Sequence, residues 1–184
     1  EHIEDKTERL IKENYYIEQV EHFNNVFGKL NNEKPTLIDK KEAQFIYDFI
    51  KEELDEYMQA YKNGDIVEVA DAFGDIMYVL SAGILAFGLK DKFKTLFDEI
   101  QASNMSKACD TENDAKQTST SISTIKGIET YHEKVGDKYI VYRSSDRKVQ
   151  KNHKYFRPNL KQFFNDEDLK RINNDTKIGK PVNS

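Results

Sequence analysis

The chain has 184 residues, of which 38% are hydrophobic and 33% charged, and its formal net charge is −5 at pH 7. That hydrophobic content supports one domain with a sizeable core and excludes a wholly disordered chain. The acidic balance argues against a protein that binds DNA or RNA polymers, because phosphate backbones select basic surfaces. The single cysteine, Cys109, excludes an internal disulfide and fits a reducing compartment, so we expect a cytoplasmic protein.

Two helices are predicted in the first third of the chain. Apolar residues recur at helical spacing from Thr7 to Phe27, and Gly28 can end this first helix. After a polar loop, Asp39 followed by Glu42 has the pattern of a capping box and predicts the start of the second helix. That helix is expected to end at Gly64.

Two further helices complete the predicted core. Asp65 can cap a third helix that runs to about Phe87, and a fourth starts near Asp91 and ends near Met105. The apolar run from Ile76 to Leu89 is too short to span a bilayer, so we expect a core or subunit interface and no membrane association. Four helices joined by short loops predict an all-α fold with a four-helix bundle core.

The C-terminal part differs in character, and we divide the chain into a helical core, 1–109, and an extension of the same domain, 110–184. Residues 110–124 are rich in Ser and Thr without a helical period, which predicts a flexible or extended segment. Residues 128–143 predict a hairpin around Gly136 and Asp137. A short amphipathic stretch, 160–172, predicts a last helix.

Six acidic residues stand out on the second and third helices. Spacings of three and four residues place each group on one helical face. An antiparallel helix pair would bring the two groups together, and converging carboxylates repel one another unless cations neutralise them. The two groups are Glu52, Glu53 and Glu56 on the second helix, and Glu68, Asp71 and Asp75 on the third.

Each acid also has a simpler explanation. Glu68 is placed to complete a capping box with Asp65, and the acids of the second helix fit a solvated face. Asp71 and Asp75, however, interrupt an otherwise apolar run, so we expect them to be buried and to need cations or partners. Oxygen ligands of this kind suit Mg²⁺, with Mn²⁺ as an alternative. The combined pattern therefore favours a metal site.

The acids also carry a resemblance. Glu53-x-x-Glu56 followed by Glu68-x-x-Asp71 resembles the paired signature of the all-α NTP pyrophosphohydrolases, which include MazG, the dimeric dUTPases and phosphoribosyl-ATP pyrophosphohydrolase. The fit is best to the MazG-like and phosphoribosyl-ATP-pyrophosphohydrolase-like branch. Three further segments support it, namely residues 69–78, residues 103–107, and the tail pattern Lys148-x-x-Lys151 with Tyr155-x-x-Pro158.

The resemblance implies Mg²⁺-dependent hydrolysis of a nucleoside triphosphate to the monophosphate and pyrophosphate, in a house-cleaning role on the nucleotide pool. The metal ligands it implies are Glu53, Glu56, Glu68 and Asp71. We assign Glu52 and Glu53 as catalytic residues, where Glu52 orients or deprotonates the attacking water or is simply a surface residue beside the site. The implied substrate-binding residues are Asn24, Asp75, Asn104, Lys107, Lys148, Lys151 and Tyr155.

The preferred substrate is dUTP or another pyrimidine deoxynucleotide. The expected partners are the nucleoside triphosphate and a second copy of the chain, since a helix apolar on most sides suggests shared burial in a dimer or a tetramer. Two alternatives stay open. One is hydrolysis of phosphoribosyl-ATP, and the other is a non-catalytic helical module that binds a nucleotide.

Overall fold

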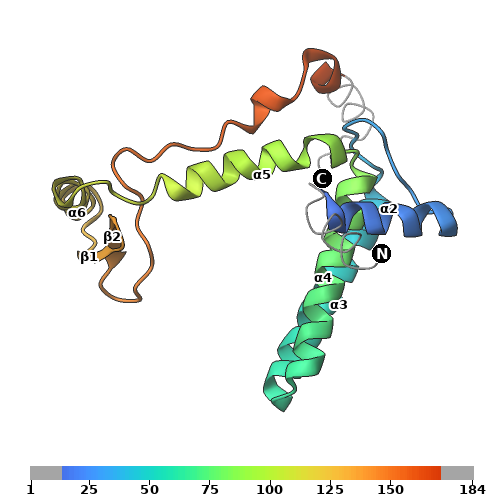
Figure 1. The fold of residues 1–184 in the computed structure, drawn as a ribbon, viewed down its shortest axis with the longest axis horizontal. Helices are drawn as coiled ribbons and strands as arrows, with labels where there is room; N and C mark the ends of the chain where they lie inside the picture. The colour runs from blue at the N-terminus through green and yellow to red at the C-terminus, as the bar shows by residue number, and fades with distance from the viewer. Residues whose placement is uncertain (1–13, 171–184) are drawn as a thin grey trace, which may run out of the picture. The chain divides into compact units, whose positions relative to one another are not determined.

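The computed structural model describes residues 14–170 (Figure 1). The described residues divide into two compact units, the first comprising residues 14–94 and 163–170 and the second residues 95–162. Within the described residues, the regular secondary structure is helical except for one two-stranded sheet. The predicted all-α fold class is confirmed.

The first unit is built on three helices, α2 (Tyr15–Phe27), α3 (Lys40–Asn63) and α4 (Ile66–Ala86). Figure 1 shows α3 and α4 as a long antiparallel pair, with α2 packed across α4. The part of the first predicted helix before residue 14 lies outside the described residues. A small core joins α2 to α4, where Ile17 and Val20 pack with Leu85.

The predicted helix boundaries follow from local hydrogen bonds. The Asp39 side chain accepts from the backbone N–H groups of Lys41 and Glu42 at 2.8 and 3.0 Å and so caps α3. Asp65 caps α4 in the same way, and Gly64 ends α3 in a left-handed conformation. These caps fix the length of the tight turn, and hence which residues of α3 and α4 face each other.

Among the described helices, α4 alone is long and apolar enough to cross a membrane. This is weak evidence for a membrane span, because the core helix of a soluble protein passes the same test. Its apolar side chains are only partly covered by α2 and α3. Several large apolar residues of the α3–α4 pair are exposed in the single chain, among them Leu54, Met58, Tyr61, Phe73, Met77 and Leu80.

The second unit contains most of α5 (Lys90–Met105), helix α6 (Glu112–Lys126), and the strands β1 (Thr130–Val135) and β2 (Lys138–Arg143). It also contains most of a 3-10 turn, η1 (Leu160–Phe163). The strands form an antiparallel hairpin in which Thr130 pairs with Arg143 and Val135 with Lys138. The predicted hairpin is confirmed. The last predicted helix, 160–172, is instead η1 followed by a helical stretch at 166–170, and its end lies outside the described residues.

The Ser/Thr-rich segment is not extended, and this prediction was wrong. Thr111 caps α6 by accepting from the backbone N–H of Asp114 at 3.1 Å. The helix buries Ala115, Thr118 and Ile122, which are spaced at helical intervals. Ala115 and Ile122 form a small core with Cys109 and Val141. The buried face was overlooked because its members are mostly small or polar.

Candidate functional site

The acidic groups of α3 and α4 meet across the helix pair, and Glu53 lies at their centre. Its side chain is half-buried, and its Oε2 atom is buried without a hydrogen-bond partner. Burial raises the pKa of Glu53, and the nearby charges of Asp75, Glu56, Glu52 and Asp71 raise it further, in that order. The turn at Gly64 has therefore brought acids of both helices together, as the sequence predicted.

The other acids are more exposed than expected. Asp71 and Asp75 were predicted to be buried, but both are exposed in the single chain, as are Glu56 and Glu68. The prediction failed because α4 has neighbours on only part of its circumference, so an apolar stretch of sequence does not by itself bury the acids within it. The backbone N–H of Glu68 donates to the Asp65 side chain at 3.2 Å, a bond that does not use the Glu68 carboxylate. The backbone N–H of Asp65, which a complete capping box would pair with that carboxylate, donates instead to the carbonyl of Ala60 at 3.1 Å.

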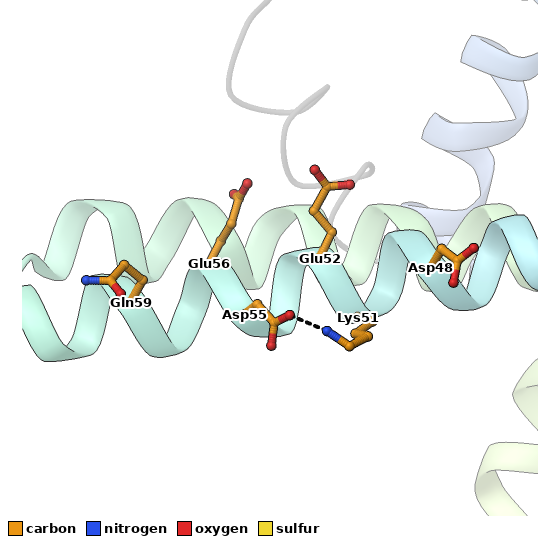
Figure 2. A pocket seen from close by; sticks show the side chains of 6 residues that line it. All are labelled: Asp48, Lys51, Glu52, Asp55, Glu56 and Gln59. Carbon is orange, nitrogen blue, oxygen red and sulfur yellow. Dashed lines mark hydrogen bonds and ion pairs between the residues drawn. The ribbon is translucent and has the colours of Figure 1, made fainter.

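Figure 2 shows the outer side of α3, where Glu52 and Glu56 point the same way. They line a shallow pocket with four neighbours, Asp48, Lys51, Asp55 and Gln59. Lys51 forms an ion pair with Asp55 on the same helix. Within this pocket, Asp48, Glu52 and Glu56 therefore form a strip of negative charge along α3.

The chemistry of this donor set fits a hard divalent cation. An ionised carboxylate with a buried, unpartnered oxygen is costly, and a cation would satisfy it and offset the repulsion among its neighbours. In the conformation seen, no three acidic, His or Cys side chains among residues 14–170 enclose a common point closely enough to hold an ion. Three of the four predicted ligands, Glu53, Glu56 and Asp71, thus lie near one another without forming a closed cage, and Glu68 is not among the charges that act on Glu53.

A wide groove adjoins the acids in the first unit. It has a volume of about 1230 Å³ and lies between α2, the first half of α3 and the second half of α4. Aromatic rings line it from all three helices, namely Phe23, Phe45, Phe49 and Tyr78. The ring of Phe23 stacks on Phe27 and meets Tyr78 edge to face, with centroids 5.6 Å apart. Such a surface suits a flat aromatic ligand.

Asn24, a predicted substrate-binding residue, lines the same groove. Its side chain is 4% exposed, and its amide nitrogen donates to the Asn31 side chain at 2.8 Å. Asn24 therefore holds the loop after α2 in place at the edge of the groove. Asp75 lies among the acids around Glu53.

In the second unit, the end of α5 is joined by short polar contacts to the tail segment, residues 148–158. Ser103 is 3% exposed and donates to the carbonyl of Phe156 at 2.9 Å, with the Tyr155 hydroxyl 3.4 Å away. The backbone N–H of Phe156 in turn contacts Ser106. The hydrogen bond with Ser103 lowers the pKa of Tyr155, and the charges of Lys151 and Lys107 lower it further.

Four predicted substrate-binding residues gather there, and one does not. Lys107 donates to the Asn104 side chain at 2.8 Å, and the ammonium of Lys151 lies 4.4 Å from the centroid of the Tyr155 ring. Lys148 instead lies in the turn after β2, where its backbone N–H donates to Asp146 at 3.1 Å.

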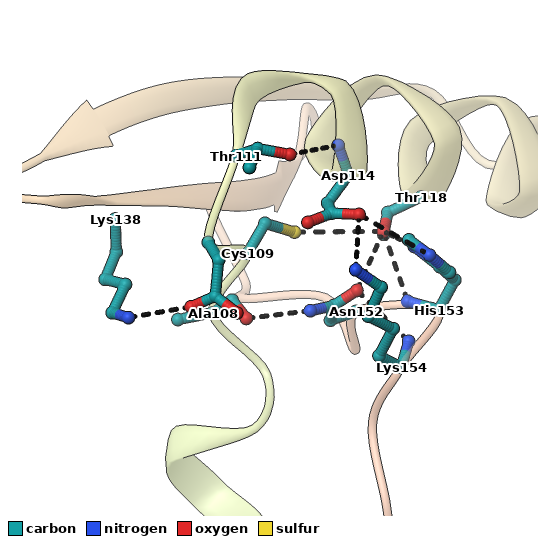
Figure 3. A network of polar contacts seen from close by, with 10 residues as sticks. Ala108, Cys109, Thr111, Asp114, Thr118, Lys138, Asn152, His153 and Lys154 are labelled. Carbon is teal, nitrogen blue, oxygen red and sulfur yellow. Dashed lines mark hydrogen bonds and ion pairs between the residues drawn. The ribbon is translucent and has the colours of Figure 1, made fainter.

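A buried polar network anchors the start of this tail to α6 (Figure 3). Thr118, 1% exposed, accepts from the backbone N–H of His153 at 3.1 Å and lies 3.1 Å from the imidazole Nδ1. Asp114 pairs with Lys154 at 2.8 Å, and this contact lowers the pKa of Asp114. Asn152 donates to the carbonyl of Ala108 at 2.8 Å. Together these contacts fix residues 152–154, directly after Lys151.

We expect Thr118→Val to destabilise the second unit by about 1–3 kcal/mol, because the shape is kept while buried partners lose their hydrogen bonds. The loss of stability is measured by urea unfolding, with tryptic cleavage at the Lys and Arg residues between 147 and 154 as the probe of the second unit. Thr120→Val is the matched control. Thr120 is an exposed residue of the same helix that bonds only the carbonyl of Lys116 among the contacts seen, so its replacement should change stability by no more than about 0.5 kcal/mol. Equal losses in the two variants would contradict the role given to Thr118.

Sequence reasoning missed three parts of this arrangement. The first is the role of Ser103 and Ser106, whose spacing of three residues places both on one face of α5. The second is the network that anchors residues 152–154 to α6, including His153, whose partners are more than 30 residues away in sequence. The third is the groove, whose aromatic residues are far apart in sequence. Regular aromatic spacing at Phe45 and Phe49 was the available signal for it.

Comparison with known proteins agrees with the acidic signature. The family model of phosphoribosyl-ATP pyrophosphohydrolase matches residues 20–104, which include α3, α4 and all six acids, while the tail residues Lys148, Lys151 and Tyr155 lie beyond the match. No curated protein matches the chain. Proteins of this family hydrolyse a phosphoric anhydride bond of a nucleotide and release pyrophosphate. Residues 20–104 therefore form a domain of the phosphoribosyl-ATP pyrophosphohydrolase family, within the MazG-like superfamily of all-α NTP pyrophosphohydrolases.

Proposed function

We propose that this pyrophosphohydrolase is Mg²⁺-dependent and converts a nucleoside triphosphate, preferably dUTP or another pyrimidine deoxynucleotide, to the monophosphate and pyrophosphate in the cytoplasm. The observation that carries the proposal is the half-buried Glu53 carboxylate, which has an unpartnered oxygen and acids around it from both helices. A cation at this place satisfies Glu53 and attracts a polyphosphate chain to an otherwise repulsive surface.

The ligands we propose for Mg²⁺, or for Mn²⁺, are Glu53, Glu56, Glu68 and Asp71. When bound, the metal would neutralise charge on the phosphates and lower the pKa of a water molecule bound to it. Glu52 is exposed one residue before Glu53 and is the proposed group that orients the water or accepts its proton. The predicted contacts with the substrate in the second unit remain Asn104, Lys107, Lys148, Lys151 and Tyr155.

The groove is the proposed place of the nucleoside. Phe49 and Tyr78, which line it, lie about one helical turn, or about 5.4 Å along the axis, from Glu53 and Asp75, respectively. A base between the aromatic rings would thus leave the phosphates beside the acids. The exposed apolar side chains of the α3–α4 pair support the further proposal that the chain is a homodimer, or a tetramer, since patches of this kind are usually covered.

The second candidate is hydrolysis of phosphoribosyl-ATP, and the family match favours it. The wide groove has room for either nucleotide. The chemistry at the acids would be the same in both cases, because each reaction releases pyrophosphate from a triphosphate.

The test is pyrophosphate release from a panel of nucleoside triphosphates and phosphoribosyl-ATP, with Mg²⁺ and with EDTA. We expect monophosphate and pyrophosphate from dUTP or another pyrimidine deoxynucleotide, with no release in EDTA. Release from phosphoribosyl-ATP alone would replace the first candidate with the second. Release of single phosphate, or unchanged release in EDTA, would contradict the proposed mechanism, and turnover of no member would favour a nucleotide-binding module.

A further inference from the structure

Asp48 lines two cavities of the first unit, the wide groove and the acidic pocket on α3. It lines the groove together with Gln44, Phe45 and Phe49, and it also lines the acidic pocket with Glu52 (Figure 2). The groove contains the aromatic rings, and the pocket contains Glu56, one of the proposed metal ligands. Asp48 therefore lies between the proposed nucleoside site and an acid of the proposed phosphate site.

This intermediate position follows from the helix geometry. Asp48 lies about one turn before Glu52 along α3, at the level of Phe49. A nucleotide has its sugar between base and phosphates, so a base among the aromatic rings and phosphates at Glu53 place the sugar at this level. A residue at this level is thus closer to the sugar than to either end of the ligand.

The chemistry of Asp48 suits a sugar. An ionised carboxylate only accepts hydrogen bonds, and a ribose or deoxyribose hydroxyl is a donor. Gln44, one turn earlier, donates its side-chain amide to Asp48 Oδ1 at 2.8 Å, which orients the carboxylate. Asp48 is exposed, so a ligand hydroxyl can reach it.

We propose that Asp48, oriented by Gln44, determines specificity for the sugar by accepting a hydrogen bond from a ribose or deoxyribose hydroxyl of the nucleotide. The proposal rests on the proposed function. It assigns Asp48 to the substrate rather than to the metal, although Asp48 belongs to the same strip of acids as Glu52 and Glu56.

The experiment compares kcat/KM for the triphosphate that is hydrolysed fastest with that for its 2′,3′-dideoxy counterpart. The unmodified protein should prefer the hydroxyl-bearing substrate by about tenfold or more, because the dideoxy compound leaves the carboxylate without its donor. In Asp48→Ala, kcat/KM for the hydroxyl-bearing substrate should fall by this factor, while kcat/KM for the dideoxy substrate should not change. The ratio of the two kcat/KM values should therefore fall to about one. Asp48→Asn keeps an acceptor oxygen and should retain part of the preference.

Asp55→Ala is the matched control, because Asp55 lies on the same helix and pairs with Lys51. It should keep the preference of the unmodified protein. If Asp48→Ala also keeps it, the proposal is wrong while the proposed function stands. If Asp48→Ala instead raises the Mg²⁺ concentration needed for half-maximal rate, Asp48 is a metal ligand and the proposal is also wrong. Absence of turnover of any nucleoside triphosphate by the unmodified protein would remove the proposed function and this proposal together.

Discussion

Glu53→Gln is expected to lower kcat/KM by about 10³-fold or more while raising the thermal stability of the metal-free protein. The loss of activity follows from replacing a proposed metal ligand at the centre of the acids by a neutral amide. The gain in stability follows from removing a half-buried charge whose neighbours Asp75, Glu56, Glu52 and Asp71 all repel it. A relief of about 1 kcal/mol corresponds to an increase in Tm of about 2–4 °C for a chain of this size.

The gain in stability should depend on pH with a definite sign. The folded-state pKa of Glu53 is raised above its ordinary value of 4.5, so ionisation of this group opposes folding. The penalty is absent below the ordinary value, grows as pH rises through the folded-state pKa, and is complete above it. In EDTA, the difference in Tm between Glu53→Gln and the unmodified protein should therefore be small near pH 4 and larger at pH 7.

Addition of Mg²⁺ at pH 7 should reverse the order of stability. The unmodified protein gains stability with metal concentration because the ion binds the folded state, whereas Glu53→Gln gains less. Thermal unfolding at several metal concentrations measures both effects. Asp55→Asn, an exposed change on the same helix, should keep its activity and show no gain in Tm in EDTA. A fall in Tm for metal-free Glu53→Gln would show that the carboxylate is already stabilised by the protein.

The features that the sequence predicted well are those determined by neighbouring residues. Asp39 and Asp65 cap their helices through backbone groups two and three positions away, so the pattern alone is sufficient. The approach of Glu53 to Asp75 then follows from the short turn between α3 and α4. The exposure of Asp71 and Asp75 depends on which helices cover α4, and hydrophobic periodicity does not report that.

Other features depend on residues that are distant in sequence. The fixation of Tyr155 by Ser103 joins α5 to a tail beyond α6 and the hairpin, and no local pattern encodes it. The groove likewise combines aromatic side chains from three helices. Helix α6 is an intermediate case. Its cap and its buried spacing are local, but Thr118 in the buried face resembles a solvent-exposed residue until its partners are known.

Gly88→Ala is expected to destabilise the first unit by about 3 kcal/mol or more, the largest loss from a single methyl group that the structure indicates. Gly88 has a φ of 64°, and a Cβ atom there would lie 2.0 Å from the carbonyl oxygen of Lys34. That oxygen belongs to the loop after α2, which is tied to the end of α4 by backbone hydrogen bonds from Asn32 to Leu85 and from Thr36 to Phe87, each 3.0 Å long. The loop has to move for the methyl group to fit.

Gly28→Ala separates the clash from the backbone strain. Gly28 has nearly the same φ, 62°, but no atom lies within 4 Å of the added Cβ. Its replacement should cost only the left-handed penalty of about 1–2 kcal/mol. Urea unfolding of the two variants measures the difference, and equal losses would show that the loop yields easily.

The clash should also affect the site, because the loop that Gly88 supports continues from Lys29 and Leu30, which line the groove. A displaced loop alters the wall of the proposed nucleoside site while Glu53 and its neighbouring acids stay in place. In folded Gly88→Ala, KM for the preferred nucleotide should therefore rise more than kcat falls. A fall in kcat at unchanged KM would instead show that the loop supports the acids rather than the groove.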